Sequence, residues 1–222
     1  MLQLENITKK YKKENETIFA LDDVSLHTEE GEFVVVSGAS GSGKTTLLLA
    51  AGGLLKPTSG KIEINNVDIY DLTPEERSVF RANNIGFVFQ QYHLIPYLTI
   101  LENVKVPMLA NKSNIPENDV IELIDSLGLK DRLHHTPAEL SAGEKQRTAL
   151  ARALLFNPKI LLADEITGNL DPVNIEIVMN RLADFKSSGG TILLVSHDKD
   201  VSKKADRIIY LEKGKNLKSV VL

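Results

Sequence analysis

The feature that most constrains the fold of this chain is the glycine-rich segment GASGSGKTT, which runs from Gly38 to Thr46. A valine-rich stretch at 32–38 precedes it and is typical of a strand buried on both faces. A leucine-rich stretch at 44–55 follows it and predicts a helix that stops at a glycine pair. The segment fits the spacing G-x-x-x-x-G-K-[ST] through Gly38, Gly43, Lys44 and Thr45. A strand, a loop and a helix in this order predict an α/β fold with a phosphate-binding loop.

The residue types in this loop suit the binding of phosphate. Glycines allow successive backbone N–H groups to point into one concave nest, and the helix start adds partial positive charge. Lys44 offers a cation for the β- and γ-phosphates, and Thr45 offers a hydroxyl for Mg²⁺. A flexible loop that matches by chance is the alternative, and the flanking strand and helix count against it. The nucleotide-binding residues expected here are Gly38, Ala39, Ser40, Gly41, Ser42, Gly43, Lys44, Thr45 and Thr46.

A second motif, ILLADE, supplies carboxylates. Asp164 follows four apolar residues that read as a buried strand, so it should lie at the carboxyl end of the sheet, where ligands bind in open α/β sheets. We expect Asp164 to join Thr45 as a Mg²⁺ ligand and Glu165 to act as the general base that polarises water. The alternative is that two carboxylates merely end a strand. The two motifs do not distinguish ATP from GTP.

Composition narrows the class of protein. The chain has 222 residues, 42% apolar and 25% charged, as in one large α/β domain or two small ones. Its net charge of -4 argues against nucleic acid as a partner. It has no cysteine, which excludes a disulfide framework. No apolar run is long enough for a signal peptide or a membrane span, so we expect neither.

Alternating and continuous apolar patterns mark the remaining elements. Strand and helix patterns alternate on both sides of a segment, approximately 91–156, in which helix signals dominate. We therefore predict one domain over 1–222, with a mainly parallel sheet covered by helices and a helical subdomain inserted at approximately 91–156. The predicted strands are 2–8, 18–28, 61–72 with a hairpin turn at Asn65 and Asn66, 84–90, 159–164, 191–197 and 206–215. The predicted helices are 116–129, one capped by Ser141 and Glu144, and 174–190.

Six further segments occur in the order found in one family. Over its whole length the chain resembles the nucleotide-binding subunit of an ABC (ATP-binding cassette) system. LSAGE resembles the signature motif, usually LSGGQ, and GNLD at 168–171 resembles the D-loop. ADRIIYLEKGK resembles the closing strand. Three single residues also match the family: Tyr11 resembles the aromatic that stacks on adenine, Gln90 the glutamine that contacts Mg²⁺ and water, and His197 the switch histidine.

Each of these residues also has a plainer interpretation. Tyr11 could serve surface packing, and His197 could be a hydrogen-bonded loop histidine. Gln90 could be a polar strand end, with Gln91 as a neighbouring alternative. Asp171 could cap a helix that has proline in its first turn. The joint order of the motifs favours the functional interpretation.

The resemblance implies a P-loop NTPase of the ABC ATPase fold. It has a RecA-like core, an N-terminal antiparallel β subdomain and an α-helical insertion. It also implies an ATPase with ATP and Mg²⁺ bound in a head-to-tail dimer, identical or mixed, that drives membrane-spanning permease subunits from the cytoplasmic face of the membrane. The implied catalytic residues are Glu165, His197, Lys44 and Gln90, and the implied metal ligands are Thr45, Gln90 and Asp164. Besides the phosphate loop, the implied nucleotide-binding residues are Tyr11, Ser141, Gly143, Glu144 and Asp171, of which Ser141 and Gly143 serve the opposite subunit and Asp171 couples the two sites.

The stretch at 83–109, together with TGNLD, resembles the lipoprotein-release and macrolide-efflux group and its cell-division relative. Export, lipoprotein or lipid extraction, or mechanotransmission is therefore expected. The alternatives are a cell-envelope regulatory or division complex that transports nothing, and a soluble assembly ATPase. Apolar residues of this stretch either receive a coupling helix or pack inside the helical insertion; they are Leu94, Ile95, Pro96, Leu98 and Ile100.

Two positions depart from the family pattern. Ala142 stands where the signature usually has glycine, and Ile166 stands where proline usually follows the catalytic glutamate. Alanine fits only if its φ stays negative. If the position needs a glycine-only conformation, Ala142→Gly should raise ATPase activity.

Overall fold

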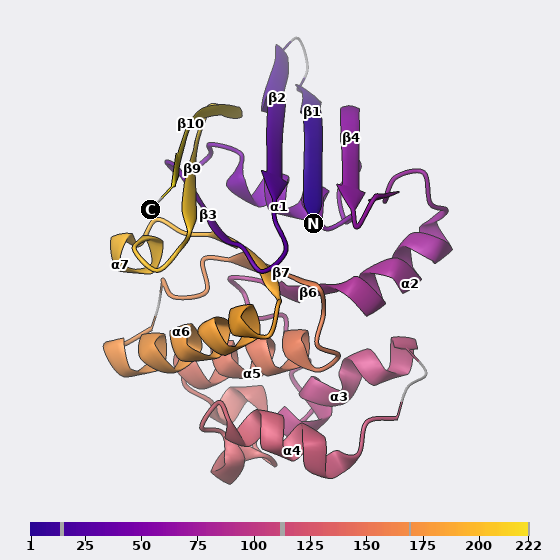
Figure 1. The fold of residues 1–222 in the computed structure, drawn as a ribbon. Coiled ribbons are helices and arrows are strands. Elements are labelled where there is room, and N and C mark those ends of the chain that lie inside the picture. Colours follow the sequence, from indigo (N-terminus) through magenta and orange to yellow (C-terminus); the bar gives the residue numbers. More distant parts are fainter. Residues whose placement is uncertain (14–15, 112–113, 169, 222) are drawn as a thin grey trace.

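A six-stranded sheet forms the centre of the fold in this computed structural model, which describes residues 1–13, 16–111, 114–168 and 170–221 (Figure 1). Its strand order is β10-β9-β3-β8-β7-β6. All pairs are parallel except β9 with β10, which is antiparallel. The strands are β3 (Phe33–Ser37), β6 (Ile85–Val88), β7 (Ile160–Asp164), β8 (Thr191–Val195), β9 (Arg207–Glu212) and β10 (Lys215–Val221).

A second, antiparallel sheet has the order β2-β1-β4-β5. Its strands are β1 (Leu2–Lys13), β2 (Glu16–Thr28), β4 (Ser59–Ile64) and β5 (Val67–Asp68). The predicted hairpin turn is confirmed, because Ile64 pairs with Val67 and both central asparagines have positive φ, 52° and 62°. Asparagine tolerates this conformation, which a two-residue hairpin turn requires. The predicted fold class, with its parallel core and N-terminal antiparallel sheet, is confirmed.

The central strands separate two hydrophobic cores. Successive side chains of a strand point to opposite faces, so Val35 joins one core while Val34 and Val36 join the other. The first core packs the helices that follow β6, and the second packs the phosphate-loop helix and the antiparallel sheet. Strands β7 and β8 are buried along their whole length, which explains why their sequences are continuously apolar.

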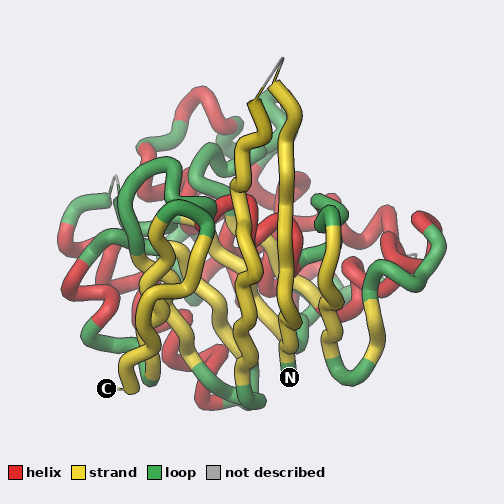
Figure 2. Tube along the Cα trace, turned by 90° about the horizontal axis from the view of Figure 1, so that it is seen from above, coloured by secondary structure: helices red, strands yellow, loops and turns green. Residues whose placement is uncertain are grey.

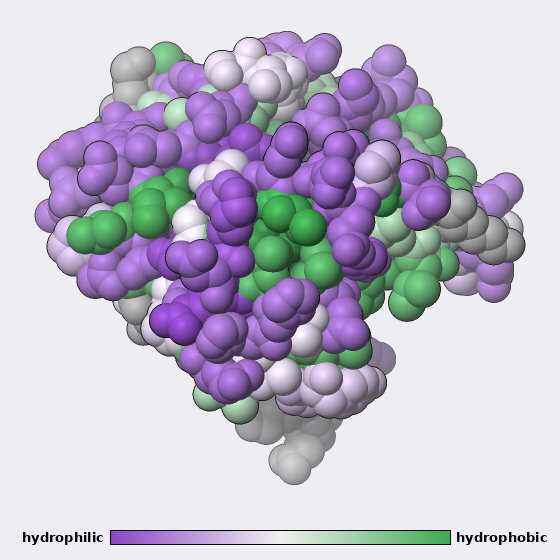
Figure 3. Space-filling view, turned by 90° about the horizontal axis from the view of Figure 1, so that it is seen from below, coloured by the Kyte–Doolittle hydropathy of each residue, from purple (hydrophilic) through white to green (hydrophobic). Residues whose placement is uncertain are grey.

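The helices are α1 (Lys44–Ala51), α2 (Pro74–Asn84), α3 (Ile100–Asn111), α4 (Glu117–Asp125), α5 (Ala142–Leu154), α6 (Pro172–Ser187) and α7 (Lys199–Ser202). Three of them, α3 to α5, lie within 91–156, at the end of the molecule opposite the antiparallel sheet (Figure 1). Their outer face is mainly hydrophilic, with hydrophobic residues gathered near its middle (Figure 3). The division of the chain at 91 and 156 stays a prediction. Among the described residues, no helix has the length and hydropathy to cross a membrane.

The sequence patterns did not place helices α2, α3 and α7 or strand β10. Helix α2 buries none of its residues, so it lacks the apolar stripe that periodicity detects. It is held by a capping box between Thr73 and Glu76. Strand β10 lies at the sheet edge and follows a turn that we expected to end the regular structure.

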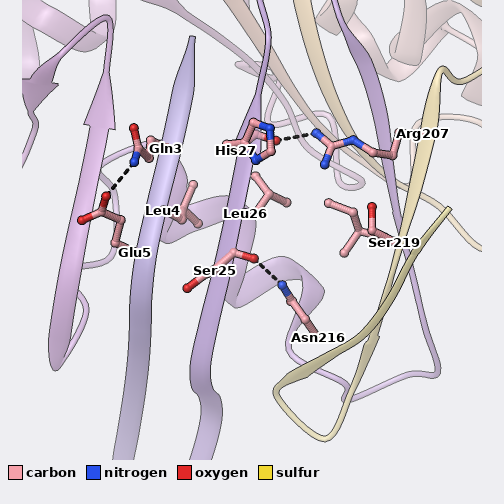
Figure 4. Close-up of a pocket in the computed structure, with 10 residues that line it drawn as sticks. Gln3, Leu4, Glu5, Ser25, Leu26, His27, Arg207, Asn216 and Ser219 are labelled. Carbon is pink, nitrogen blue, oxygen red and sulfur yellow. Dashed lines mark hydrogen bonds between the residues drawn. The ribbon is translucent and has the colours of Figure 1, made fainter. Parts of the chain in front are cut away.

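The two sheets meet where β2 lies beside β9 and β10, which Figure 2 shows from above. The amide of Asp22 donates to the Gly214 carbonyl over 2.8 Å. Arg207 donates from Nε to Glu32 Oε1 over 2.7 Å. A terminal nitrogen of Arg207 donates to the His27 carbonyl (Figure 4). These bonds fasten the antiparallel sheet beside the loop that precedes α1.

Candidate functional site

A cleft of about 670 Å³ opens at the carboxyl ends of the parallel strands. The loop between β3 and α1 forms one wall, the start of β2 forms another, and side chains at or after the carboxyl ends of β6, β7 and β8 form the rest. Its lining residues are Ile18, Phe19, Ala20, Gly38, Ala39, Ser40, Gly41, Gly43, Lys44, Thr45, Thr46, Gln90, Asp164, Glu165 and His197. Residues from five separate segments of the sequence therefore meet here, and all but those of β2 were predicted to act together.

Two glycines of the loop are required by close backbone approach. A Cβ at Gly43, where φ is +102°, would lie 2.2 Å from the Ala20 carbonyl oxygen. A Cβ at Gly38 would lie 2.1 Å from the Leu211 carbonyl oxygen. Gly43 is also the N-cap of α1 and offers no side-chain hydrogen bond. The first amides of α1 are therefore left for a ligand.

The Lys44 side chain is folded into this loop. Its Nζ donates to the carbonyl oxygens of Gly38 and Ala39, over 2.8 and 2.9 Å. Lys44 is only 9% exposed, although its residue type is seldom buried without a partner. Two carbonyls thus hold a buried ammonium group at the floor of the cleft. The negative charge of a bound anion would stabilise this positive charge further.

Asp164 and Thr45 meet in the same cleft. The Thr45 hydroxyl donates to Asp164 Oδ2 over 2.9 Å. Burial raises the pKa of Asp164, against the opposing effect of the Thr45 bond. A hydroxyl and a buried carboxylate that converge on one point are oxygen ligands of the kind that Mg²⁺ prefers. No cluster of three or more His, Cys, Asp or Glu ligands occurs among the described residues. Any metal held here would therefore take its other ligands from hydroxyl or amide side chains, from water or from the phosphates of a bound nucleotide.

Glu165 and His197 lie in contact at the mouth of the cleft. His197 Nδ1 lies 2.7 Å from Glu165 Oε2, and the glutamate side chain is 16% exposed against 70% for the histidine. The backbone of Glu165 has φ of +50°, an uncommon conformation for a residue with a side chain. Its amide donates to the Val195 carbonyl over 2.9 Å, which holds this turn against the end of β8. Such strain often accompanies functional sites.

The departure at Ile166 has a structural consequence. Ile166 is 1% exposed and belongs to the core that packs the helices after β6. A proline would restrain this turn through its ring, whereas isoleucine anchors it by burying an apolar side chain. The turn that carries Glu165 is thus fixed on one side by the Val195 carbonyl and on the other by Ile166.

Tyr11 is not among the residues that line the cleft. It lies on β1, is 44% exposed and is paired in the strand register with Ile18 of β2. Ile18 and its neighbour Phe19 do line the cleft, and sequence patterns missed both. The sequence shows only that Phe19 is an aromatic residue in a predicted strand. The structure leaves it 42% exposed and, through the β1–β2 pairing, places it beside the phosphate loop. Tyr11 is therefore the register neighbour of a residue that lines the cleft.

The signature segment forms the predicted capping box. Ser141 Oγ accepts from the Glu144 amide over 3.2 Å, and Glu144 Oε2 accepts from the Ser141 amide over 2.8 Å. The Ser141 amide holds the pKa of Glu144 below its usual value, against the opposing effect of burial. Arg132 also donates to Glu144 Oε1 over 3.2 Å. Ala142 is the first residue of α5 and is absent from the residues with positive φ, so alanine fits here without strain.

Asp171 caps α6 next to the start of α5. It accepts from the Asn174 amide over 2.9 Å and from the Asn174 side chain. The Asn174 amide lowers the pKa of Asp171. A Cβ at Gly143 would lie 2.6 Å from Asn174 Cγ, so the two helix starts touch through a glycine. Asn169 of the GNLD segment lies outside the described residues.

Four of the predicted nucleotide-binding residues lie away from the cleft, which none of them lines: Ser141, Gly143, Glu144 and Asp171. They lie at the starts of α5 and α6, where Ser141 and Asp171 are exposed, Glu144 is half-buried and Gly143 is buried. The chain therefore separates the predicted residues into two groups, and it does not bring the groups together by itself.

The apolar stretch after β6 packs largely inside the molecule. Ile100 is fully buried, and Leu94 packs against the same core. The Ile95 amide donates to Asn103 Oδ1 over 2.8 Å, and Asn103 Nδ2 donates to the Ile95 carbonyl over 3.1 Å. A groove of about 370 Å³ lies beside this stretch but is lined by other residues, including Phe87, Phe89, His93, Val106, Pro107, Arg152 and Phe156. Internal packing is thus the better account of Leu94 and Ile100.

Comparison with known proteins gives a consistent result. Residues 21–168 match the family described as ABC transporter. An ABC transporter ATP-binding protein of Methanocaldococcus jannaschii, MJ0796, is 44% identical over 96% of this chain and 94% of its own length. The lipoprotein-releasing system ATP-binding protein LolD of Rickettsia bellii is 42% identical over 96% of both chains. The macrolide export protein MacB of Rhodopirellula baltica is 41% identical, but the chain spans only 32% of its length.

Solved structures agree with this relationship. A dimeric structure of the MJ0796 cassette superimposes with a TM-score of 0.96 at 41% identity and covers 100% of this chain and 99% of its own. A second dimeric structure, described as a post-hydrolysis state bound to ADP and Pi, has a TM-score of 0.95 with the same coverage.

Proposed function

Because this chain belongs to the ABC transporter family as an ATP-binding domain with ATPase chemistry, we propose that it is the subunit that drives a membrane complex by binding and hydrolysing ATP. The observation that carries this proposal is the cleft that joins Lys44, Asp164 and the Glu165–His197 pair. Both solved structures of the relative MJ0796 are described as dimeric, and we propose a dimer for this chain as well.

In this mechanism the chain positions the phosphates and neutralises their charge, since phosphoryl transfer needs little covalent chemistry from the protein. The loop amides and Lys44 hold the β- and γ-phosphates. Thr45, Gln90 and Asp164 are the residues that would hold Mg²⁺, which would supply further positive charge to the phosphate oxygens. Glu165 orients a water molecule and accepts its proton, and His197, 2.7 Å away, keeps the carboxylate in place.

The separation of the predicted residues into two groups supports a head-to-tail dimer. The start of α5 has amides at Ala142 and Gly143 without partners among the described residues, so it can receive an anion. Nothing in the same chain brings these amides to the cleft. A second chain would close the nucleotide between its α5 and the first chain's phosphate loop, and Asp171 would lie between the two sites.

The groove beside β6 is the docking site that we propose for a membrane-spanning partner. Phenylalanines 87, 89 and 156 give it an apolar floor, and it adjoins the loop that carries Gln90. LolD belongs by its name to a lipoprotein-releasing system and MacB to macrolide export. We accordingly propose peripheral binding at the cytoplasmic face of a membrane, in an export or extraction complex. The alternative of a non-transporting envelope complex uses the same surfaces.

The substitution Glu165→Gln tests this function. It removes the general base but keeps the size of the side chain, so kcat should fall about a thousandfold while ATP binding persists. Phosphate release measures kcat, and size-exclusion chromatography with ATP and Mg²⁺ should show a stable dimer.

Glu63→Gln is the matched control, because Glu63 is a half-buried carboxylate on β4 outside the cleft. It should leave turnover and elution unchanged. Unaltered turnover in Glu165→Gln would refute the role of this residue. Co-purification with a membrane subunit, followed by lipid extraction or transport in vesicles, separates a transporter from an envelope complex.

A further inference from the structure

The loop that carries Gln90 has an unusual backbone. Tyr92 and His93 both have positive φ, 61° and 46°, in consecutive positions. Residues with a Cβ disfavour this left-handed backbone conformation. Two consecutive residues that adopt it therefore need support from their surroundings. Internal bonds supply part of it: the Tyr92 amide donates to the Phe89 carbonyl over 3.0 Å, and the His93 ring lies edge-on to Phe89 with centroids 4.9 Å apart.

Arg152, in the last turn of α5, supplies the rest. One terminal nitrogen of its guanidinium donates to the Tyr92 carbonyl and the other to the His93 carbonyl, both over 2.6 Å. These are the carbonyls of the two strained residues. No carboxylate partner of Arg152 occurs among the described residues, and burial lowers its pKa. A half-buried cation is thus committed to two backbone oxygens.

We propose that Arg152 is a positioning residue that braces this loop so that the Gln90 side chain enters the nucleotide cleft, an inference that rests on the role proposed for Gln90. A planar guanidinium suits the task, because its two terminal nitrogens meet two neighbouring oxygens at once. A lysine ammonium would reach one oxygen firmly and leave the other carbonyl free.

The position of Arg152 gives the brace a second consequence. Helix α5 begins at the signature residues and carries this arginine in its last turn, and its inner face is buried from Gln146 to Leu154. One continuous helix therefore joins the signature residues to the Gln90 loop. Arg152 and His93 also line the groove proposed for the membrane partner, so one side chain contacts both the groove and the loop.

Two variants test the brace. In Arg152→Gln we expect the Mg²⁺ concentration for half-maximal ATPase activity to rise about tenfold, since both charge-assisted bonds are lost. Binding of ATP in the absence of Mg²⁺, measured by a fluorescent analogue, should stay within about twofold because the phosphate loop is untouched. Arg152→Lys keeps the charge and the fold, and should give an intermediate shift.

A second readout does not depend on activity. Chymotrypsin cleaves after aromatic residues, and the loop contains Tyr92 and Tyr97. Cleavage at these sites, followed by mass spectrometry, should be about tenfold faster in Arg152→Gln, because the loop opens more often. Arg207→Gln is the matched control: this arginine is also half-buried and also donates to a backbone carbonyl, but between β9 and β2. It should leave both readouts unchanged.

The outcomes separate the brace from the function of Gln90. If Gln90→Ala leaves the Mg²⁺ dependence unchanged, the role proposed for Gln90 is wrong, and cleavage at Tyr92 still decides whether Arg152 holds the loop. If Gln90→Ala shifts the Mg²⁺ dependence and Arg152→Gln does not, the brace is wrong. Unchanged cleavage in both Arg152 variants also overturns it.

Discussion

Helices α1 and α5 both begin at residues predicted to bind a nucleotide, yet their starts are built differently. Gly43 gives α1 no side-chain cap, and no acidic residue lies in its first turn. Ser141 and Glu144 close a capping box at α5, and the glutamate places a negative charge there. A free helix start inside a cleft is ready for phosphate, whereas a capped one on the surface is already stable. The first can bind a nucleotide within one chain, and the second needs a partner to bring one.

The strongest test of this difference uses one variant at each helix start. Lys44→Ala removes the buried cation and should weaken ATP binding about a hundredfold, because charge-assisted bonds to phosphate are lost. Ala142→Asp adds a carboxylate at the exposed start of α5, where the helix dipole tolerates it but a phosphate is repelled. ATP binding should persist in this variant while turnover falls roughly tenfold or more. Equilibrium binding and phosphate release distinguish the two.

Mixing these two impaired proteins sharpens the comparison. A mixed dimer has one site in which an intact phosphate loop faces an intact α5, because each variant damages a different half. Turnover should recover to as much as about a quarter of the wild-type value, since about half of the dimers are mixed and each has one whole site. Failure of the mixture to exceed either protein alone would contradict the division of the site between two chains.

The substitution Asp164→Asn should separate stability from function. The folded-state pKa of Asp164 is raised by burial, so its protonated form is favoured in the fold. The contribution of this carboxyl to the free energy of unfolding is fully present below the pKa that Asp164 has in the unfolded chain. It is lost as pH rises through the pKa that Asp164 has in the folded protein. At neutral pH the buried carboxylate therefore costs stability, and the amide should raise Tm by about 2 to 4 °C while ATPase activity is lost.

Thermal unfolding at several pH values checks this prediction, and the gap in Tm should narrow toward acid. Asp184→Asn is the control, since Asp184 is an exposed carboxylate on α6. Its Tm should stay within about 1 °C of the wild type. A lower Tm for Asp164→Asn at neutral pH would show that the Thr45 bond outweighs the cost of burial.

The smallest expected effect is that of Ala142→Gly. Alanine already has a helical backbone at this position, so glycine relieves no strain. Turnover should remain within about twofold, and stability should fall by about 0.5 kcal/mol because glycine is more flexible in the unfolded chain. Denaturant unfolding and phosphate release measure both, and a clear gain in turnover would show that alanine hinders closure of the dimer.

Local chemistry determined the phosphate loop, the strand that ends in Asp164 and the capping box at Ser141, and all of these could be predicted from the sequence. Each depends on residues close together in the chain, where spacing and backbone preference suffice. The continuous apolar strands likewise predicted a parallel sheet, because only strands buried on both faces have that pattern.

Contacts between distant segments were decided only by the tertiary structure. The β1–β2 register takes Ile18 and Phe19 to the cleft and leaves Tyr11 beside Ile18. The two bonds from Arg152 span about sixty positions of sequence, and no periodic pattern encodes them. Sequence by itself determined which residues can bind a nucleotide, since that is a property of local backbone and side-chain chemistry. The packed sheet and helices decided that they form two groups on one chain, because only packing sets the direction in which a helix start faces.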